Sequence, residues 1–304
     1  MTTGDATARE VFLTDDELTL NAEENTVLDA YLEKRFQGRF SMGGIQFWQE
    51  IDALPEAIEQ KLSVYDQIVP IFTNVIFDTS QAHANRAFEH MFAWLDATLE
   101  IIRDYPETLF VLRAHPDELR PHSRKKSRET VAQWVEKTGA DQLPNLLFID
   151  PLQYLSSYDL IQRSKFILAY NSSIALEAVL LGKLPVCAGW AWYVEYPTVC
   201  APQTADEYRQ QAEELLAAET VDLPDEFKQT ARSLVHYQNF RASLPFGRYL
   251  EPHTIRGYVR FKPFDVNLLD ARRDDTIQTV LDGIAGDARV LNLPRSGETG
   301  REGR

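Results

Sequence analysis

The sequence has no long hydrophobic run and is poor in basic residues. No stretch of about 18 apolar residues occurs, and the start, MTTGDATARE, lacks the basic flank and apolar segment of a signal peptide. The 304 residues include 31 Lys and Arg against 46 Asp and Glu, a formal net charge of −15. This charge disfavours broad binding to nucleic acid or anionic lipid, so an anionic ligand needs a local site. We expect a cytoplasmic protein without a transmembrane segment.

Cysteine is equally scarce. Cys187 and Cys200 lie in apolar, strand-like surroundings without CxxC spacing or nearby histidines, which excludes a disulfide framework and a zinc site. We expect two buried, inert thiols. The motifs GxGxxG, GxxxxGK[ST], HExxH and GxSxG are also absent, so dinucleotide-binding, P-loop, zincin and hydrolase functions have no support in the sequence.

What is present is a regular alternation of apolar strands and amphipathic helices between residues 63 and 202. Near-continuous apolar strands predict a parallel sheet that is covered on both faces, with ligands at the carboxyl ends of the strands. The fold class is therefore α/β, with a Rossmann-like doubly wound sheet. The expected strands are 67–75, 109–114, 146–149, 166–170 and 184–188, and the expected helices between them are 85–104, 127–138, 156–163 and 173–181.

The flanking segments lack this alternation. Residues 1–62 form an acidic segment with helical patterns at 24–36 and 46–61, and residues 203–290 carry helical patterns at 204–219, 225–243 and 272–284 that we expect to pack on the domain. Residues 243–269 show no clear period. The end, 291–304, has the composition of a disordered tail.

His115 directly follows the second expected strand, in the sequence VLRAHPDELRP, and Arg113 lies two residues before it. At a strand end, an imidazole can donate a hydrogen bond to a phosphate or to a departing oxyanion. A loop histidine that caps a helix or a backbone carbonyl explains the same position. The residues alone leave both interpretations open.

Asn171, Ser172 and Ser173 form the turn that opens the helix after the fourth strand. These residue types are favoured helix caps, and the same geometry makes an anion site, because backbone N–H groups and the helix dipole favour a phosphate. Glu177 lies one turn later. It could accept hydrogen bonds from ribose hydroxyls or only complement the helix dipole.

Thr73 and Asn74 follow the first strand. They face the same site if the strand order reverses between the first and fourth strands, as it does in doubly wound sheets. Otherwise they belong to an ordinary polar turn, together with Asp78. A basic run at 120–128 follows His115 and either forms a solvated surface or attracts an anionic substrate.

The order of these motifs resembles the capsule polysaccharide biosynthesis family. The motifs are HP after a strand, SSYDLI before a strand, and NSS, LEA, LGK and P around the next helix, with FTNVIFD and FRASLPF at the two ends of a region covering 63–250. The family's fold resembles GT-B glycosyltransferases, notably the bacterial Kdo-transferring and polysialic-acid-synthesising enzymes. The resemblance implies that this chain contains the donor-binding half of a GT-B-type fold.

The resemblance also implies a function. It implies transfer of a sugar from a nucleotide-activated donor, with CMP-linked sugars among the candidates, to a glycan or lipid-linked acceptor during assembly of capsule or another surface polysaccharide. It implies no cofactor and no metal, and a location in the cytoplasm that includes the inner face of the membrane and peripheral association with an assembly complex. It gives His115 a catalytic role at the donor phosphate, Ser172 and Ser173 a phosphate-binding role, and Glu177 a ribose-binding role. Asn171, Arg113, Thr73 and Asn74 complete the expected nucleotide site.

One departure from the family concerns the acceptor side. GT-B enzymes have two Rossmann-like domains, whereas about sixty helical residues precede the first strand here. Either this chain is the donor-binding half of something larger, or the acceptor surface is built from the helical N-terminal segment, the C-terminal segment or a partner. Glu50 or Asp52 is a candidate base only by position. Two alternative functions follow: a non-catalytic nucleotide-binding or assembly subunit, and a teichoic-acid-type polyol-phosphate transferase.

Overall fold

The computed structural model describes residues 13–14, 18–37, 54–77, 81, 83–119, 127–153, 155–254 and 258–286. These residues divide into two compact units. The first contains the described residues of 13–14 and 54–232, and the second contains 18–37 and 233–286. Among the described residues, no helix is both long and apolar enough to span a bilayer. Expectations for Glu50, Asp52, Asp78 and residues 120–126 and 291–304 lie outside this part of the chain.

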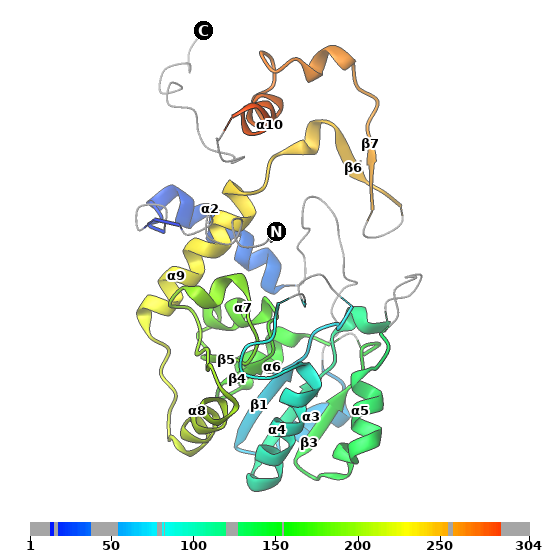
Figure 1. The fold of residues 1–304 in the computed structure, drawn as a ribbon, viewed down its shortest axis with the longest axis vertical. Helices are drawn as coiled ribbons and strands as arrows, with labels where there is room; N and C mark the ends of the chain where they lie inside the picture. Colours follow the sequence, from blue (N-terminus) through cyan, green and yellow to red (C-terminus); the bar gives the residue numbers. More distant parts are fainter. Residues whose placement is uncertain are drawn as a thin grey trace. The chain divides into compact units, whose positions relative to one another are not determined.

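The first unit is built on a five-stranded sheet with the order β3-β2-β1-β4-β5 (Figure 1). All neighbouring strands are parallel. The order runs from β1 to β3 in one direction and then reverses to place β4 and β5 on the other side of β1. This confirms the predicted doubly wound sheet. The strands are β1 (Gln67–Phe72), β2 (Thr108–Arg113), β3 (Leu146–Ile149), β4 (Ile167–Ala169) and β5 (Pro185–Cys187).

Helices cover both faces of this sheet. One apolar cluster joins α4, α5 and α8 to the strands, and a second joins α3 and α6 to the opposite face. Helix α7 packs against β4 and β5, and α8 packs against α4 and β5. The bounds are α3 (Glu56–Leu62), α4 (Met91–Asp104), α5 (Val131–Thr138), α6 (Ser157–Arg163), α7 (Ile174–Leu180) and α8 (Ala205–Ala217).

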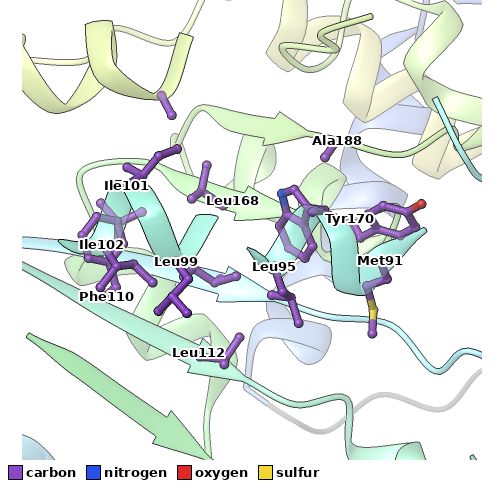
Figure 2. Packing of buried hydrophobic residues seen from close by; sticks show 14 of the residues in the cluster. Met91, Leu95, Leu99, Ile101, Ile102, Phe110, Leu112, Leu168, Tyr170 and Ala188 are labelled. Carbon is purple, nitrogen blue, oxygen red and sulfur yellow. The ribbon is translucent and has the colours of Figure 1, made fainter. Parts of the chain in front are cut away.

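The core follows the alternation of side chains along β2. Phe110 and Leu112 belong to the cluster under α4, whereas Leu109 and Val111 belong to the cluster under α3 and α6, as expected when successive residues point to opposite faces. Figure 2 shows the α4 side of this core, where one stripe of the helix lies over β2 and β4. The labelled residues are Met91, Leu95, Leu99, Ile101, Ile102, Phe110, Leu112, Leu168, Tyr170 and Ala188.

Capping residues set the helix ends. Thr130 and Gln133 form a capping box at α5, and Gly139 ends that helix in the left-handed conformation, with φ 64°. Three helices differ clearly from the predicted bounds: α4 begins at Met91 rather than 85, α3 begins at Glu56 rather than 46, and α9 (Asp225–His236) ends at 236 rather than 243. The side chain of His90 caps α4 by accepting a hydrogen bond from the N–H of Ala93, and residues 86–90 form a bend. Histidine is not among the usual N-cap residues, so the sequence pattern did not indicate that α4 begins after His90.

The second unit consists of α2 (Ala22–Phe36), the end of α9 (Asp225–His236), a π-helical turn (Tyr237–Arg241), a hairpin of β6 (Leu250–Pro252) and β7 (Val259–Phe261), and α10 (Asp275–Ala285). Arg241 forms an ion pair of 2.6 Å with Glu24. Asp274, the N-cap of α10, accepts a hydrogen bond of 2.6 Å from the Tyr249 hydroxyl. The hairpin falls in the region 243–269, for which the sequence showed no period.

The two cysteines are free thiols. Cys187 is buried, and burial raises the pKa of its thiol to about 12, as expected for an inert core thiol. Cys200 is only half-buried, which corrects the expectation of full burial, although burial still raises its pKa. Its position is explained by a parallel bridge to Val186 beside β5.

The chain after β1 is tied to the chain after β5. The Trp190 N–H donates to the Ala84 carbonyl at 2.6 Å, and the Ala87 N–H donates to the Ala188 carbonyl at 3.3 Å. Gly189 lies between these two contacts. A Cβ atom on Gly189 would lie 2.9 Å from the Ala84 oxygen and 3.1 Å from the Tyr170 oxygen, and both are backbone atoms. The glycine therefore permits the close approach of the two loops.

We predict that Gly189→Ala destabilises the protein by about 1–3 kcal/mol, because the added methyl group must displace backbone atoms. Urea denaturation measures the change. Gly247→Ala is the control, since a Cβ at Gly247 meets nothing within 4 Å, and it should change stability by no more than about 0.5 kcal/mol. Equal stability of the two variants would show that the close approach is not rigid.

Candidate functional site

The carboxyl ends of β2, β1 and β4 lie side by side. Phe72, the last residue of β1, is in register with Arg113 of β2 and with Ala169 of β4. Beyond the strands, the Thr73 N–H and hydroxyl both donate to the Arg113 carbonyl, at 3.3 and 3.2 Å, and the Tyr170 N–H donates to the Phe72 carbonyl at 3.3 Å. The residues that follow these strands therefore share one edge of the sheet, at the point where the strand order reverses.

His115 is half-buried and begins the turn after β2. Its Nδ1 accepts a hydrogen bond of 3.1 Å from the Asp117 N–H, and its carbonyl accepts one of 2.9 Å from the Glu118 N–H. The capping interpretation is thus correct for Nδ1. Because Nδ1 acts as an acceptor, the neutral imidazole carries its proton on Nε2. The capping contact consequently fixes Nε2 as a hydrogen-bond donor, and the two interpretations of this histidine are compatible.

The turn between β4 and α7 contains the Asn171-Ser172-Ser173 segment. Asn171 is buried, and its Oδ1 accepts a hydrogen bond of 3.0 Å from Gln81 Nε2. Ser172 Oγ accepts a long hydrogen bond of 3.4 Å from the Ile174 N–H. Ser173 occupies the N-cap position and is exposed, yet its side chain makes no capping hydrogen bond. Capping therefore does not explain the Ser173 hydroxyl.

Glu177 is buried in the first turn of α7. Its Oε2 accepts a hydrogen bond of 2.6 Å from the hydroxyl of Tyr158 on α6. The carboxylate is thereby held between two helices, a contact that the sequence did not indicate. Its contribution to the helix dipole and its predicted role toward a ribose are both compatible with this position.

Arg113 is almost completely buried, with 3% of its surface exposed. Its Nη1 donates to the Gln153 carbonyl at 2.6 Å, and no described residue provides a hydrogen-bond partner for its Nε. Burial lowers the pKa of the guanidinium to about 10, against the opposing effect of Asp150. Arg113 thus holds the loop after β3, and its nucleotide-binding role stays a prediction.

Thr73 and Asn74 are both buried. The Thr73 hydroxyl is used within the fold, as described above. The Asn74 N–H donates to the sulfur of Met91 at 3.3 Å, whereas its side-chain Oδ1 is buried and has no hydrogen-bond partner in the part of the chain that the structure describes. Asn74 is therefore the residue of this pair with an unused polar atom.

Glu118 is a buried acid that the sequence did not single out, because DEL after a His-Pro pair looks like an exposed polar turn. It is 3% exposed. Its Oε1 accepts a hydrogen bond of 3.0 Å from the Val131 N–H at the start of α5, and its Oε2 has no partner among the residues that the structure describes. Burial, with a smaller contribution from Asp150, raises its pKa to about 7, against the lowering effect of the hydrogen bond.

Comparison with known proteins gives only structural matches. No protein-family model and no curated protein matches the sequence. Solved structures do match: the Kdo transferase KpsC of Thermosulfurimonas dismutans, a β-Kdo 2,4 transferase, is 12% identical with a TM-score of 0.45, over 73% of this chain and 57% of that chain. The UDP-GlcNAc 2-epimerase of Neisseria meningitidis, bound to UDP-GlcNAc, is 16% identical with a TM-score of 0.38. The match covers 60% of this chain and 46% of the epimerase chain. The UDP-GlcNAc 2-epimerase of Methanocaldococcus jannaschii, in complex with UDP-GlcNAc and UDP, is 14% identical with a TM-score of 0.38. The match covers 70% of this chain and 52% of the epimerase chain.

This chain therefore spans about half the length of the solved chains that it matches. The likenesses are partial, with TM-scores below 0.5, so the assignment of a function depends on the chain's own residues at the sheet edge.

We predict that Glu118→Gln stabilises the protein at pH 8 and has less effect at pH 5. The folded-state pKa of about 7 lies above the ordinary value of 4.5, so ionisation of Glu118 opposes folding and stability falls as the pH rises between these values. A pKa difference of this size changes the free energy of unfolding by roughly 3 kcal/mol at most. We expect urea denaturation to show a gain of about 1–3 kcal/mol at pH 8, since glutamine keeps an acceptor for the Val131 N–H.

Glu129→Gln is the control, because Glu129 is exposed in the turn just before α5. As a substitution on the surface, it should change stability by no more than about 0.5 kcal/mol. A pH-independent effect of Glu118→Gln would show that the carboxyl group is not buried in its charged form.

Proposed function

We propose that this chain binds a nucleotide-activated sugar at the carboxyl edge of its sheet and transfers the sugar to an acceptor hydroxyl. The observation that carries the proposal is the convergence of three strand ends at the reversal of strand order, which is where doubly wound sheets bind their ligands. His115 follows β2, Asn74 follows β1, and the Asn171-Ser172-Ser173 turn follows β4. The resemblance of the motifs to the capsule polysaccharide biosynthesis family favours the same function.

In this proposal the donor phosphate lies between His115 and the start of α7. The Nε2–H of His115 donates to a phosphate oxygen, since Nδ1 is already used as an acceptor. The Ser173 hydroxyl is exposed and makes no capping bond, so it is available to a second phosphate oxygen. Ser172 and Asn171 shape the turn that holds Ser173. Glu177, held by Tyr158, faces the ribose.

The transfer step moves charge onto the leaving nucleotide. An acceptor hydroxyl oxygen forms a bond to the anomeric carbon, the bond from that carbon to the phosphate oxygen breaks, and the electron pair leaves with the nucleotide. The hydrogen bond from His115 strengthens as this negative charge develops, and loss of one such donor typically reduces the rate by about 10²–10³-fold. The acceptor proton passes to a base that we do not assign to a described residue.

The acceptor in this proposal is a glycan or a lipid-linked glycan of a surface polysaccharide, and the chain works at the inner face of the membrane. A CMP-linked sugar is one candidate donor, and UDP-linked sugars, which two of the matched structures contain, are others. A polyol-phosphate transferase would prefer CDP-linked polyols. An assembly subunit would bind a nucleotide without turning over its sugar.

We predict that His115→Ala reduces donor turnover by about 10²–10³-fold, because the leaving phosphate loses a positioned donor. Donor hydrolysis and transfer are measured with CMP-, CDP- and UDP-linked substrates. His115→Gln is the matched variant: its side-chain amide N–H can replace Nε2–H, so we expect it to retain part of the activity that His115→Ala loses.

Unchanged turnover in His115→Ala would contradict the role of this histidine. Nucleotide binding by the unaltered protein without hydrolysis or transfer of any donor would favour the assembly subunit. Turnover restricted to CDP-linked polyols would favour the polyol-phosphate transferase.

A further inference from the structure

Asn74 has a buried acceptor without a donor. The residue is 8% exposed, and Oδ1 of its side chain is buried with no hydrogen-bond partner among the described residues. Buried polar atoms in folded proteins almost always have a partner, because an unpaired carbonyl oxygen that is removed from water costs free energy. No described residue supplies a donor to this atom, so its partner is a group outside the described residues.

Several neighbouring polar atoms at the sheet edge have partners, whereas Arg113 Nε and Glu118 Oε2, like Asn74 Oδ1, have none among the described residues. The Thr73 hydroxyl donates to the Arg113 carbonyl, Asn171 Oδ1 accepts from Gln81, and His115 Nδ1 accepts from the Asp117 N–H. These contacts satisfy the acceptors on either side of β1. Asn74 Oδ1 differs from them, although it lies between them in the strand order.

The position of Asn74 is fixed by its backbone. Its N–H donates to Met91 Sδ on α4, and the preceding residue, Thr73, is held on the Arg113 carbonyl by two hydrogen bonds. A side chain on such a support is suited to recognise a ligand group, since little conformational freedom is lost on binding.

The chemistry of an acceptor excludes a phosphate as its partner. Ionised phosphate oxygens are themselves acceptors, so Oδ1 requires an O–H or N–H group. Neighbouring strands lie about 4.8 Å apart, which places Asn74 within about one sugar ring of a phosphate held at the ends of β2 and β4. The groups at that distance from the phosphates of a nucleotide sugar are the hydroxyls of the ribose and of the transferred sugar.

We propose that Asn74 Oδ1 accepts a hydrogen bond from a sugar hydroxyl of the bound donor and selects for a ligand that carries this hydroxyl. The inference rests on the proposed function and assigns Asn74 to sugar recognition rather than to the phosphate. His115 and Ser173 then contact the charged part of the donor, and Asn74 contacts an uncharged part.

The test is calorimetric titration of the unaltered protein and of Asn74→Leu with a graded set of ligands. The uridine set is UDP-N-acetylglucosamine, UDP, 2′-deoxy-UDP, 3′-deoxy-UDP and inorganic pyrophosphate. The cytidine set is CMP-N-acetylneuraminate, CMP, 2′-deoxy-CMP, 3′-deoxy-CMP and inorganic phosphate. Leucine has nearly the shape of asparagine and removes only the polar atoms.

We expect Asn74→Leu to weaken binding of hydroxyl-bearing ligands by about 3- to 10-fold, the range for loss of one neutral hydrogen bond, and to leave pyrophosphate or phosphate binding unchanged. If the ribose supplies the hydroxyl, UDP or CMP shows the loss and one of its deoxy forms does not. If the transferred sugar supplies it, only the nucleotide sugar shows the loss.

Apo-protein stability separates ligand recognition from a structural role. Because Oδ1 has no partner among the described residues, Asn74→Leu should unfold at the same urea concentration as the unaltered protein or at a higher one. Asn74→Ala provides a smaller side chain if leucine does not fit, with the same expected ligand pattern.

Either of two results would overturn the inference without contradicting the proposed function. The first is equal affinity of the unaltered protein and the variants for every ligand. The second is a loss of pyrophosphate or phosphate binding as large as the loss of binding of the hydroxyl-bearing ligands. A clear destabilisation by both variants would also overturn it, since it would mean that Oδ1 is used within the fold. If the unaltered protein binds no ligand of either set, the proposed function fails, and the inference fails with it.

Discussion

The parallel pairing of β1 with β2 on one side and with β4 on the other is the constraint on which the rest of the structure depends. Phe72 is in register with both Arg113 and Ala169, so three segments separated by up to about a hundred residues leave the sheet at the same level. The pairing is fixed by burial on both faces, because a one-residue shift would exchange the two sets of side chains. The site geometry is therefore a consequence of core packing.

The sequence predicted this arrangement to the extent that it depends on pattern. Apolar runs and helical periods located all five strands of the sheet, and turn residues identified the polar strand ends. The reversal of strand order was an assumption taken from doubly wound sheets, and the observed order confirms it. The short hairpin of β6 and β7 was missed because three-residue strands with exposed side chains carry no period.

The individual contacts of the site could not be predicted from the sequence. The tie between Tyr158 and Glu177, the burial of Glu118 and the unpaired oxygen of Asn74 all depend on which side chains meet across elements that are distant in the chain. Composition does not indicate such contacts, because a glutamate in a polar turn is usually exposed. Ser173 shows the converse: its residue type predicts a capping hydrogen bond from the side chain, and the structure has none at this N-cap.

The electrostatic properties of the sheet's carboxyl edge also depend on the burial of side chains there. In a chain with a formal net charge of −15, the groups proposed to hold a phosphate are the neutral N–H of His115 and the hydroxyl of Ser173, whose binding strength depends on direction rather than on net charge. Burial raises the pKa of Glu118, three residues from His115, to about 7. Burial thereby removes part of a negative charge from the turn that would otherwise repel an anionic ligand. In the proposed function, desolvation of one acid and orientation of one imidazole together favour a phosphate at this edge of an acidic protein.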